Sequence, residues 1–582
     1  MKAPPGRAPG RSARLPPADV AAVVALVVIG VVVPAVLAGT SHVFSIPSND
    51  DWAYRRDLWE FVRTAHMSFA GWGAMTLVGQ VLWGALFAAV FGTRAWAPGA
   101  AVAVLATAGV VAAYAVARSV LSRGKALACV LVVLALPGFA LSTSSFMTDV
   151  PAFSAQVVCL AIAVAALGRE GRARWGLLAA ALAVGCFGFS VREFDIAAPL
   201  AAIGALALQD RRHRLTYGLA TVGLVVACGG IYLWATHVPG AQNIPLALSG
   251  PVRFIKGVGN SYFTVSLGLV PLLPAAVRRS WPQLSARPVL VALGTLVAGA
   301  LLLVSDHTLF NGNYLLQQGA TGAAVLTGRP ALFPSAVWWA LQLVALAGGA
   351  LLAAVAATLG RQSSSARRLS YPRVLLVLFS ILTAIFLCFF EGLTRGTVFD
   401  RYLWPLDFSL AVLLLARRPA PSPQAHALGT RAHAGVAGAH AGPLTGPRRQ
   451  LTFLLVTAAL STVVAAVATV ITLNADAYDA ARWSAGDKAV ATGVPATMVD
   501  AGFEWVGSHQ SAVALPGRRV PGAPFYDTWF DQMFPAFNEC AFVSGNEVSL
   551  PWLRRLATVT YQELGFTERQ DLYVYLVRKP GC

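Results

Sequence analysis

Long apolar runs recur along most of the chain, and they constrain its fold more than any other feature. They lie at about 20–38, 99–117, 126–141, 150–167, 176–191, 194–209, 215–234, 261–277, 288–305, 335–358, 373–390, 403–416 and 452–473. Most approach the roughly 20 residues that a helix needs to cross a bilayer, although several are short and 176–209 fits one interrupted helix equally well. The sequence therefore predicts an all-α polytopic membrane protein with about thirteen transmembrane helices.

Basic residues indicate both the class of partner and the orientation. A net charge of +18 would suggest nucleic-acid binding in a soluble protein, but Lys and Arg fall in short clusters between apolar runs. Such clusters mark the cytoplasmic side of a membrane protein, and most of them share one side only if the apolar stretch at 71–91 does not span. We therefore predict a multi-pass protein of the cell (plasma) membrane with a cytoplasmic N-terminus and no nucleic-acid partner. In this orientation 71–91 is re-entrant or interfacial.

The same orientation divides the chain into three parts. Residues 1–17 form a cytoplasmic flank, 18–473 a transmembrane domain, and 474–582 a small extracytoplasmic α/β domain. Within the transmembrane part, 40–98 is the first extracytoplasmic loop and contains membrane-parallel helices. The stretch 418–450 is rich in Ala, Gly, Pro and His and is predicted to be a cytoplasmic linker.

The unusual carboxylates all fall on the predicted extracytoplasmic side. Acids at a membrane are costly to keep and usually serve chemistry or transport. Those of this chain are Asp50, Asp51, Asp149, Glu193, Asp306, Glu391 and Asp400. The same side holds Cys540 and Cys582, which could form a disulfide outside the cytoplasm.

Two adjacent carboxylates, Asp50 and Asp51, follow the first apolar run. One of them could act as a general base towards a hydroxyl or amine, with Trp52 or Tyr54 stacking on a sugar face. The competing interpretation makes Asp50 or Asp51 the N-cap of an interfacial helix. Both hold if one acid caps the helix and the other faces a cavity.

Two further charged motifs stand at the outer ends of apolar runs. Asp149 precedes Pro151, where a helix cap is a sufficient explanation, but its predicted side and depth match those of Asp50. Arg192 and Glu193 break an apolar region and fit either a local ion pair, with Glu193 or Asp195 as the partner of Arg192, or ligand binding.

The last motif is Asp400-Arg401-Tyr402, at the outer edge of another run. The guanidinium of Arg401 suits a lipid phosphate, because it binds oxygens in a fork and stays charged. Snorkelling of Arg401 towards anionic head groups explains the position equally well.

Together the motifs resemble the GT-C superfamily of polytopic glycosyltransferases, which use polyprenyl-phosphate-linked sugars. The likeness is closest to the branch of protein mannosyltransferases and lipid A aminoarabinose transferases, and it extends over about 50–405. It implies a GT-C-like fold in which Asp50 or Asp51 is the base, with Asp50 the first choice. The family more often shows Asp-Glu at this place, so the choice stays open. The likeness further implies that Asp149 positions the acceptor or donor and that Arg401 or Arg192 binds the lipid phosphate. It also implies substrate binding by Trp52, Tyr54, Glu193, Asp400 and Tyr402.

The predicted function is that of a hexosyl- or pentosyltransferase at the extracytoplasmic face. It would transfer a sugar from a polyprenyl-phosphate-linked donor, among membrane lipids, to an envelope glycan, lipid or protein. The alternative is a transporter or flippase of lipid-linked sugars, which would place charges at the bilayer midplane and show internal repeats. No repeat is visible in the sequence. The motifs call for no cofactor, and a divalent metal ion is left open.

Overall fold

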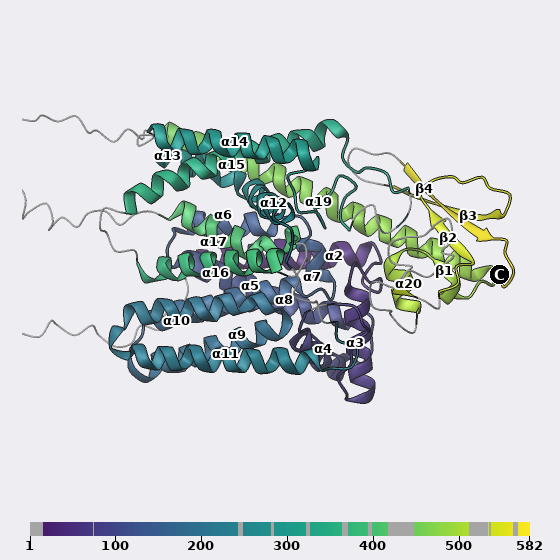
Figure 1. The fold of residues 1–582 in the computed structure, drawn as a ribbon, viewed down its shortest axis with the longest axis horizontal. Helices are drawn as coiled ribbons and strands as arrows, with labels where there is room; N and C mark the ends of the chain where they lie inside the picture. Colours follow the sequence, from purple (N-terminus) through teal and green to yellow (C-terminus); the bar gives the residue numbers. More distant parts are fainter. Residues whose placement is uncertain are drawn as a thin grey trace, which may run out of the picture.

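The computed structural model describes residues 16–582 apart from 74, 243–247, 281–284, 322–325, 327, 364–369, 394–397, 417–446, 511–532, 535–536 and 563–568. The predicted flank 1–17 and linker 418–450 therefore lie mostly outside the described residues. The described part is a bundle of helices with a small sheet beyond one end (Figure 1).

Each predicted apolar run is largely helical. From the second predicted run onwards the helices are α5 (Ala97–Arg118), α6 (Arg123–Leu134), α7 (Phe139–Ser144), α8 (Asp149–Leu167), α9 (Gly171–Val191), α10 (Ala197–Gln209), α11 (Arg214–Thr236), α12 (Pro251–Leu269), α13 (Leu273–Ser280), α14 (Ala286–Asp306), α15 (Ser335–Ser363), α16 (Tyr371–Leu393), α17 (Trp404–Leu415) and α19 (Pro447–Ala491). Short 3₁₀ turns include η2 (Glu193–Ile196) and η6 (Asp400–Leu403).

The fold class of a mainly α-helical, multi-pass membrane protein with a small C-terminal sheet is confirmed. Ten helices in the described part of the chain are long and apolar enough to cross a membrane. The predicted count of thirteen is not confirmed, because α6, α10 and α17 have only 12, 13 and 12 residues. The ambiguous run 176–209 is broken, since η2 separates α9 from α10.

The first span changes its helical winding midway. It consists of α1 (Pro17–Val27), the π-helical turn η1 (Val28–Val32) and α2 (Val33–Thr40). Pro34 has no backbone N–H and its ring would clash with the carbonyl four residues earlier, at Gly30, so the wider turn accommodates it. Gly30 packs against Leu134, where a Cβ atom would lie 2.9 Å from the leucine side chain.

Two shorter helices follow the first span. Helix α3 (Asp51–Thr64) lies across the ends of the bundle helices in Figure 1. Helix α4 (Val78–Phe91) has 14 residues and packs against α3, α5 and α9. At roughly 1.5 Å per residue α4 is too short to cross a bilayer, which agrees with the expectation that 71–91 does not span.

The chain ends in a four-stranded sheet. Its strands are β1 (Val499–Asp500), β2 (Ala541–Ser544), β3 (Leu553–Gln562) and β4 (Arg569–Val577), in the order β1-β2-β4-β3. Only β1 and β2 pair in parallel. We call this sheet, together with α20 (Phe503–His509) and the last turns of α19, the C-terminal domain. A disulfide joins Cys540 in this domain to the terminal Cys582.

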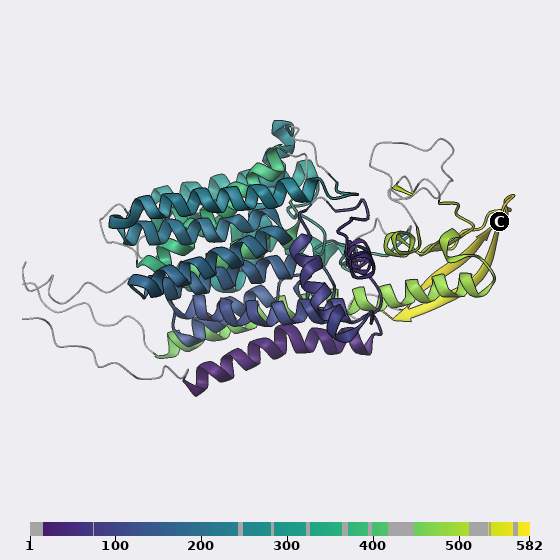
Figure 2. The same cartoon turned by 90° about the horizontal axis from the view of Figure 1, so that it is seen from below.

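Helix α19 connects the two parts of the molecule. It has 45 residues and runs without a break from the bundle into the C-terminal domain (Figures 1 and 2). There Tyr478, Ala485 and Trp505 share an apolar core with Val543 and Val574 of the sheet. The sheet is therefore anchored on a helix that is itself embedded in the bundle.

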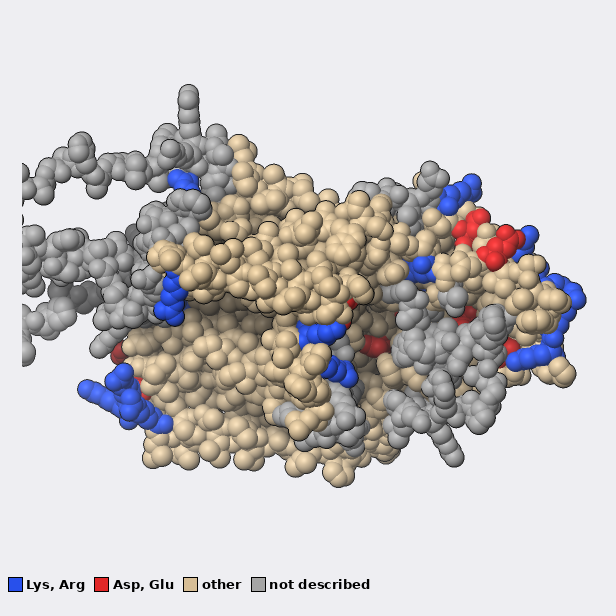
Figure 3. All heavy atoms as spheres, turned by 45° about the horizontal axis from the view of Figure 1, so that its top comes forward, with Lys and Arg blue, Asp and Glu red and all other residues tan. Residues whose placement is uncertain are grey.

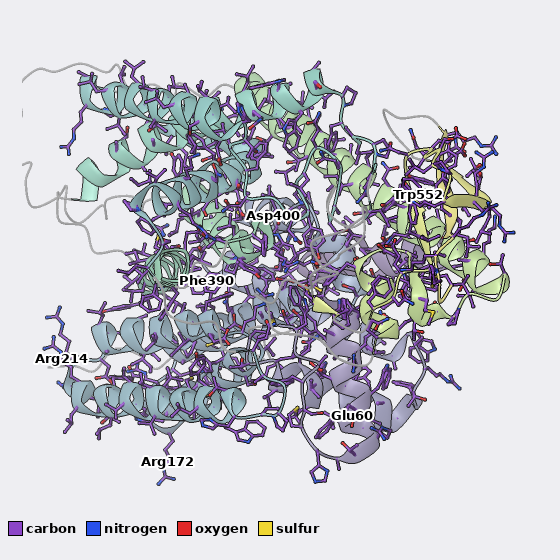
Figure 4. The ribbon with its side chains drawn as sticks, turned by 45° about the vertical axis from the view of Figure 1, so that its right-hand side comes forward. Glu60, Arg172, Arg214, Phe390, Asp400 and Trp552 are labelled. Atoms are coloured by element: carbon purple, nitrogen blue, oxygen red, sulfur yellow. A yellow bond between two sulfur atoms is a disulfide. The ribbon has the colours of Figure 1, made fainter. Side chains whose placement is uncertain are left out.

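The two ends of the bundle differ in character. Arg172 and Arg214 lie at the end away from the C-terminal domain, whereas Glu60 and Trp552 lie towards the other end (Figure 4). The motifs with unusual acids lie at the end of the bundle nearer the C-terminal domain.

Candidate active site

Asp50 stands at the N-cap position of α3 and faces a cavity. Its side chain makes no capping hydrogen bond. Instead, Trp72 donates from Nε1 to Asp50 Oδ1 at 2.8 Å, and Arg401 Nη2 lies 3.1 Å from Asp50 Oδ2. The Asp50 side chain keeps 13 % of its surface exposed. A neutral donor and a cation therefore hold Asp50 in one orientation while it stays accessible from the cavity.

Arg401 brings the separate motifs together. Besides Asp50, it reaches Asp149 Oδ1 with Nε at 3.3 Å and donates from Nη1 to Asn313 Oδ1 at 2.6 Å. Arg192 approaches Asp149 Oδ1 with Nη2 at 3.1 Å. Asp149, Arg192 and Arg401 are all nearly fully buried. The structure thus gathers Asp50, Asp149, Arg192 and Arg401 from four distant parts of the sequence into one cluster.

Asp149 has unused hydrogen-bonding capacity inside this cluster. Its two ion-pair contacts do not have hydrogen-bond geometry, and both of its oxygens are buried without a hydrogen-bond partner. The two arginines balance the charges of Asp50 and Asp149, which is the condition for keeping buried charges in a stable fold. Asp149 itself does not line the cavity, so it contributes through the two arginines that it contacts, both of which do.

Asp400 does not line the cavity but holds the backbone beside the cluster in place. Its Oδ2 accepts the backbone N–H groups of Asn313, Tyr314 and Leu315 at 3.4, 2.9 and 2.6 Å, and its Oδ1 accepts that of Arg401 at 2.8 Å. Burial raises the pKa of Asp400 to about 6, against the lowering effect of these donors. Asp400 therefore fixes the loop that presents Asn313 to Arg401.

Asp51 and Trp52 point away from the cavity. Asp51 is fully buried and forms an i,i+4 ion pair with Arg55, with an Nη2–Oδ2 distance of 2.8 Å and a second contact from Nε at 2.8 Å. Trp52 is 2 % exposed and packs against Phe503 and Phe534. Neither Asp51 nor Trp52 is among the residues that line the cavity.

Tyr54 and Tyr402 do line the cavity. Tyr54 donates from its hydroxyl to Met75 Sδ at 3.3 Å. The ring of Tyr402 lies 4.3 Å from the Arg192 guanidinium carbon, within the range of a cation–π interaction. This stacking, together with a hydrogen bond of 2.7 Å from Arg192 Nε to Thr148 Oγ1, sets the direction of Arg192.

Glu193 lies beside Arg192 but is not its ion-pair partner in the structure. Arg192 pairs with Asp149 instead, and Asp195 accepts a hydrogen bond from Gln156. Burial raises the pKa of Glu193 to about 7, while backbone N–H groups and Arg192 act in the lowering direction. Glu193 can therefore donate or accept a proton near neutral pH.

The cavity continues into an apolar groove. The cavity measures about 430 Å³ and the groove about 310 Å³. Residues shared by both linings are Gly73, Met75, Glu193, Phe194, Gln242 and Phe390. The groove extends between α11 and α16, where Tyr232 and Phe389 are 45 % and 53 % exposed on the surface of spanning helices. Figure 3 shows the surface hollowed between two groups of helices, with basic side chains near the end closer to the C-terminal domain.

Several residues of the site were not predicted. Trp72, Asn313, Gln242 and Phe503 line the cavity, and Trp72 and Asn313 contact Asp50 and Arg401 directly. Trp72 carried only a weak signal, because it is one of many aromatic residues in the first extracytoplasmic loop. Asn313 and Phe503 are uncharged residues far from the motifs in sequence. In the part of the chain that the structure describes, no group of three His, Cys, Asp or Glu side chains is arranged to hold a metal ion.

Comparisons with known proteins find a protein family and solved structures that are similar to this chain. Residues 81–234 match the family model of dolichyl-phosphate-mannose-protein mannosyltransferase, a segment that contains Asp149 and Arg192. The crystal structure of ArnT from Cupriavidus metallidurans bound to undecaprenyl phosphate aligns at 14 % identity and a TM-score of 0.42, covering 96 % of this chain and 98 % of ArnT.

The Archaeoglobus fulgidus oligosaccharyltransferase in its apo form aligns at 18 % identity and a TM-score of 0.40, covering 80 % of this chain and 57 % of that one. A comparison with curated protein sequences finds no match. The family match covers α4 to α11, in the N-terminal half of the predicted likeness over 50–405. This match confirms the predicted resemblance of the chain to the protein mannosyltransferase branch of the GT-C superfamily.

Proposed function

We propose that this protein is a membrane glycosyltransferase that transfers a hexose or pentose from a polyprenyl-phosphate-linked donor to an envelope glycan, lipid or protein. The reaction would take place on the extracytoplasmic face of the cell membrane, with the C-terminal domain on that side. The observation that carries the proposal is the position of Arg401 between Asp50 and Asp149 in a cavity that continues into an apolar groove. A ligand with a charged head and a long apolar tail fits this combination.

The shape supports one placement of the two ends of the donor. The isoprenoid tail would lie in the groove between α11 and α16, where the lining is mostly aromatic and aliphatic. The phosphate would then stand near Arg192 and Arg401, and the sugar near Asp50 and Tyr54. Guanidinium groups bind phosphate oxygens in pairs, so Arg192 and Arg401 together supply enough donors for the head group.

The reaction that follows is a single displacement at the anomeric carbon. Asp50 takes the proton of an acceptor hydroxyl or amine while that oxygen or nitrogen forms a bond to the anomeric carbon. The bond from the anomeric carbon to the phosphate oxygen breaks, and its electron pair leaves with the polyprenyl phosphate. Arg401 and Arg192 stabilise the charge that develops on this leaving group.

Charge balance adds a condition to this mechanism. Without substrate, Arg401 is paired with Asp50 and with Asp149, so the cluster has no excess positive charge. A phosphate would draw Arg401 away from Asp50, and the carboxylate would become free to accept a proton. Glu193 in its protonated form could donate a hydrogen bond to the same phosphate, since its pKa is raised to about 7 by burial.

Supporting evidence comes from the match of residues 81–234 to a family of mannosyltransferases that act on a lipid phosphate-linked sugar. The alternative function, transport of a lipid-linked sugar, requires alternating access through the bilayer. The charged cluster lies towards one end of the bundle, which favours transfer. No step above depends on a bound metal ion.

The test uses the purified protein in detergent, where transport has no meaning. It is incubated with polyprenyl phosphates that carry tritium-labelled hexoses or pentoses and with an envelope extract as acceptor. Transfer of label to the extract, and its loss in Asp50→Asn, would support the enzyme. Retention of full transfer in Asp50→Asn would refute the proposed base. Translocation in liposomes without any transfer in detergent would establish the transporter instead.

A further inference from the structure

The C-terminal domain contacts the loop that carries Asp50 through two neighbouring residues of α20. We propose that Glu504 of this helix is a positioning residue for Asp50, so that the C-terminal domain sets the geometry of the base; the inference rests on the proposed function. Glu504 lies more than 450 residues from Asp50 in sequence and is fully buried. Its role would be to orient the catalytic loop, not to touch the substrate.

The first link runs through the backbone of Asn49. Glu504 Oε1 accepts the Asn49 N–H at 2.8 Å, and Asn49 Nδ2 donates to Asn313 Oδ1 at 3.1 Å. The same Asn313 oxygen accepts Arg401 Nη1 at 2.6 Å, and Arg401 Nη2 pairs with Asp50. These contacts close a ring that begins and ends at adjacent residues, Asn49 and Asp50.

The backbone of Asn49 makes this link sensitive. Its φ of +58° lies in the left-handed region, which costs a non-glycine residue of order 1 kcal/mol and persists only when neighbours hold it. The Glu504 carboxylate, in the C-terminal domain, accepts the Asn49 N–H. Withdrawal of that acceptor would let Asn49 relax and would shift the next residue, Asp50.

The second link runs through aromatic rings. Phe503 lines the cavity and meets the ring of Trp72 edge-on at a centroid distance of 5.5 Å. Trp72 in turn donates its Nε1 hydrogen to Asp50 Oδ1. Neighbouring residues of α20 thus lead to Asp50 by two routes, one polar through Asn49 and one apolar through Trp72.

Glu504 is itself fixed by a buried ion pair. Arg482 Nη1 on α19 donates to Glu504 Oε2 at 2.6 Å, and both side chains are fully buried. Arg482 lies on α19, which continues into the bundle, so this ion pair connects the acceptor for Asn49 to the transmembrane part. Removal of Glu504 would leave the buried Arg482 with Asp479, at 2.9 Å, as its ion-pair partner and could destabilise the domain. The test therefore needs variants that keep or remove the acceptor in one common background, from which Arg482 has been removed.

Two double variants differ only in that acceptor. R482M/E504Q retains an amide oxygen for the Asn49 N–H, while R482M/E504M replaces it with an apolar side chain of similar length. We expect kcat for transfer of labelled sugar to be about tenfold lower in R482M/E504M than in R482M/E504Q, with the two KM values within about twofold of each other. This factor corresponds to the loss of one hydrogen bond to a positioning group. A third variant, Glu504→Asp, keeps the charge for Arg482 but is one methylene shorter, and it should lose kcat to a similar extent.

Arg56→Ala provides the matched control. Arg56 joins α3 to the same domain by donating from Nη1 to the Gln510 carbonyl oxygen at 2.8 Å, but this contact does not lead to Asp50. Its kcat should stay within about twofold of wild type. Equal kcat in the two double variants, wild-type kcat in Glu504→Asp, or an equal loss in Arg56→Ala would overturn the inference. If Asp50→Asn itself retains full transfer, the proposed base fails, and the reason for positioning Asp50 fails with it. If Asp50→Asn loses transfer but the Glu504 variants do not behave as expected, only the present inference fails, so the two failures are distinguishable.

Discussion

The adjacent carboxylates Asp50 and Asp51 are expected to give opposite phenotypes when each is replaced by Asn. They have the same chemistry and neighbouring positions, but Asp50 faces the cavity and Asp51 is buried against Arg55. Asp50→Asn should lower kcat strongly and leave the fold intact. Asp51→Asn should destabilise the fold and leave the turnover of the folded fraction close to wild type.

The magnitudes follow from the contacts. Asp51 is fully buried and meets the guanidinium of Arg55 twice at 2.8 Å, so neutralising Asp51 leaves a buried cation without its counter-charge. Removal of one partner from such a pair costs about 3–5 kcal/mol of the free energy of unfolding. Arg55 keeps its bonds of 3.2 Å to the carbonyl oxygens of Phe44 and Ala95, which favours the lower end of that range.

The loss in Asp50→Asn concerns the rate instead. A positioned general base contributes typically about 10²- to 10⁴-fold, so kcat should fall by that factor. The Asn side chain can still accept the Trp72 N–H, and the remaining carboxylate, Asp149, can still pair with Arg401. The free energy of unfolding should therefore change by less than about 2 kcal/mol.

The assays are sugar transfer in detergent and thermal unfolding of the same preparations. A control, D51L/R55M, replaces the buried pair with apolar side chains and should recover much of the stability lost in Asp51→Asn. The reasoning is refuted if Asp51→Asn loses turnover at an unchanged melting temperature. It is equally refuted if Asp50→Asn unfolds at a much lower temperature but retains its activity.

Three further predictions concern pH and covalent structure. Burial raises the pKa of Glu193 to about 7, and its charged form repels a phosphate, so the affinity of the wild type for undecaprenyl phosphate should fall by roughly tenfold as pH rises through about 7. Glu193→Gln should lack this fall. Equal pH profiles of binding in wild type and variant would contradict the prediction. Burial also raises the pKa of Asp400 to about 6, so the folded state holds this proton more tightly than the unfolded chain, and the stabilisation present below about pH 4 is lost as pH rises through about 6. The difference in melting temperature between wild type and Asp400→Asn should follow that course, and a pH-independent difference would exclude it. C540S/C582S opens a link that spans 42 residues and should cost the C-terminal domain about 4 kcal/mol, seen as faster amide exchange in β2 and β4 but not in α8.

Much of the bundle could be predicted from the sequence because apolar length and helical structure are directly linked in a membrane. The number of spanning helices was not confirmed, because length alone decided it. Helices α6, α10 and α17 are apolar but have only 12 to 13 residues: the run of α6 breaks before α7, η2 takes up the start of the run of α10, and the run of α17 is itself short. An apolar run therefore shows that a segment lies away from water, but it does not show that the whole run is one spanning helix.

The charged members of the site were also accessible to sequence reasoning, whereas their roles were not. Asp50, Asp149, Arg192 and Arg401 were singled out because charge at a membrane edge is costly, and the structure gathers them in one cluster. The choice between the two adjacent acids depends on the residue at which α3 begins. A helix that begins at Asp51 pairs that acid with the residue four positions later and leaves Asp50 outside, but the sequence does not define this boundary to one residue.

Asn313 and Phe503 could not be predicted for a different reason. Each is uncharged, lies in a loop or a short helix, and reaches the site only through tertiary contacts such as the backbone bonds to Asp400 or the packing of Phe503 on Trp72. Pattern and composition carry no information on contacts between segments hundreds of residues apart. Such residues became visible only with the complete fold.

The apolar groove between α11 and α16 ends at exposed side chains on spanning helices, among them Tyr232 and Phe389. A molecule that enters there diffuses in two dimensions, and what counts for saturation is its mole fraction among the surrounding lipids rather than its molarity in the bulk solution. Diluting a vesicle suspension would leave the rate per protein unchanged, while adding inert lipid to the same vesicles would lower it.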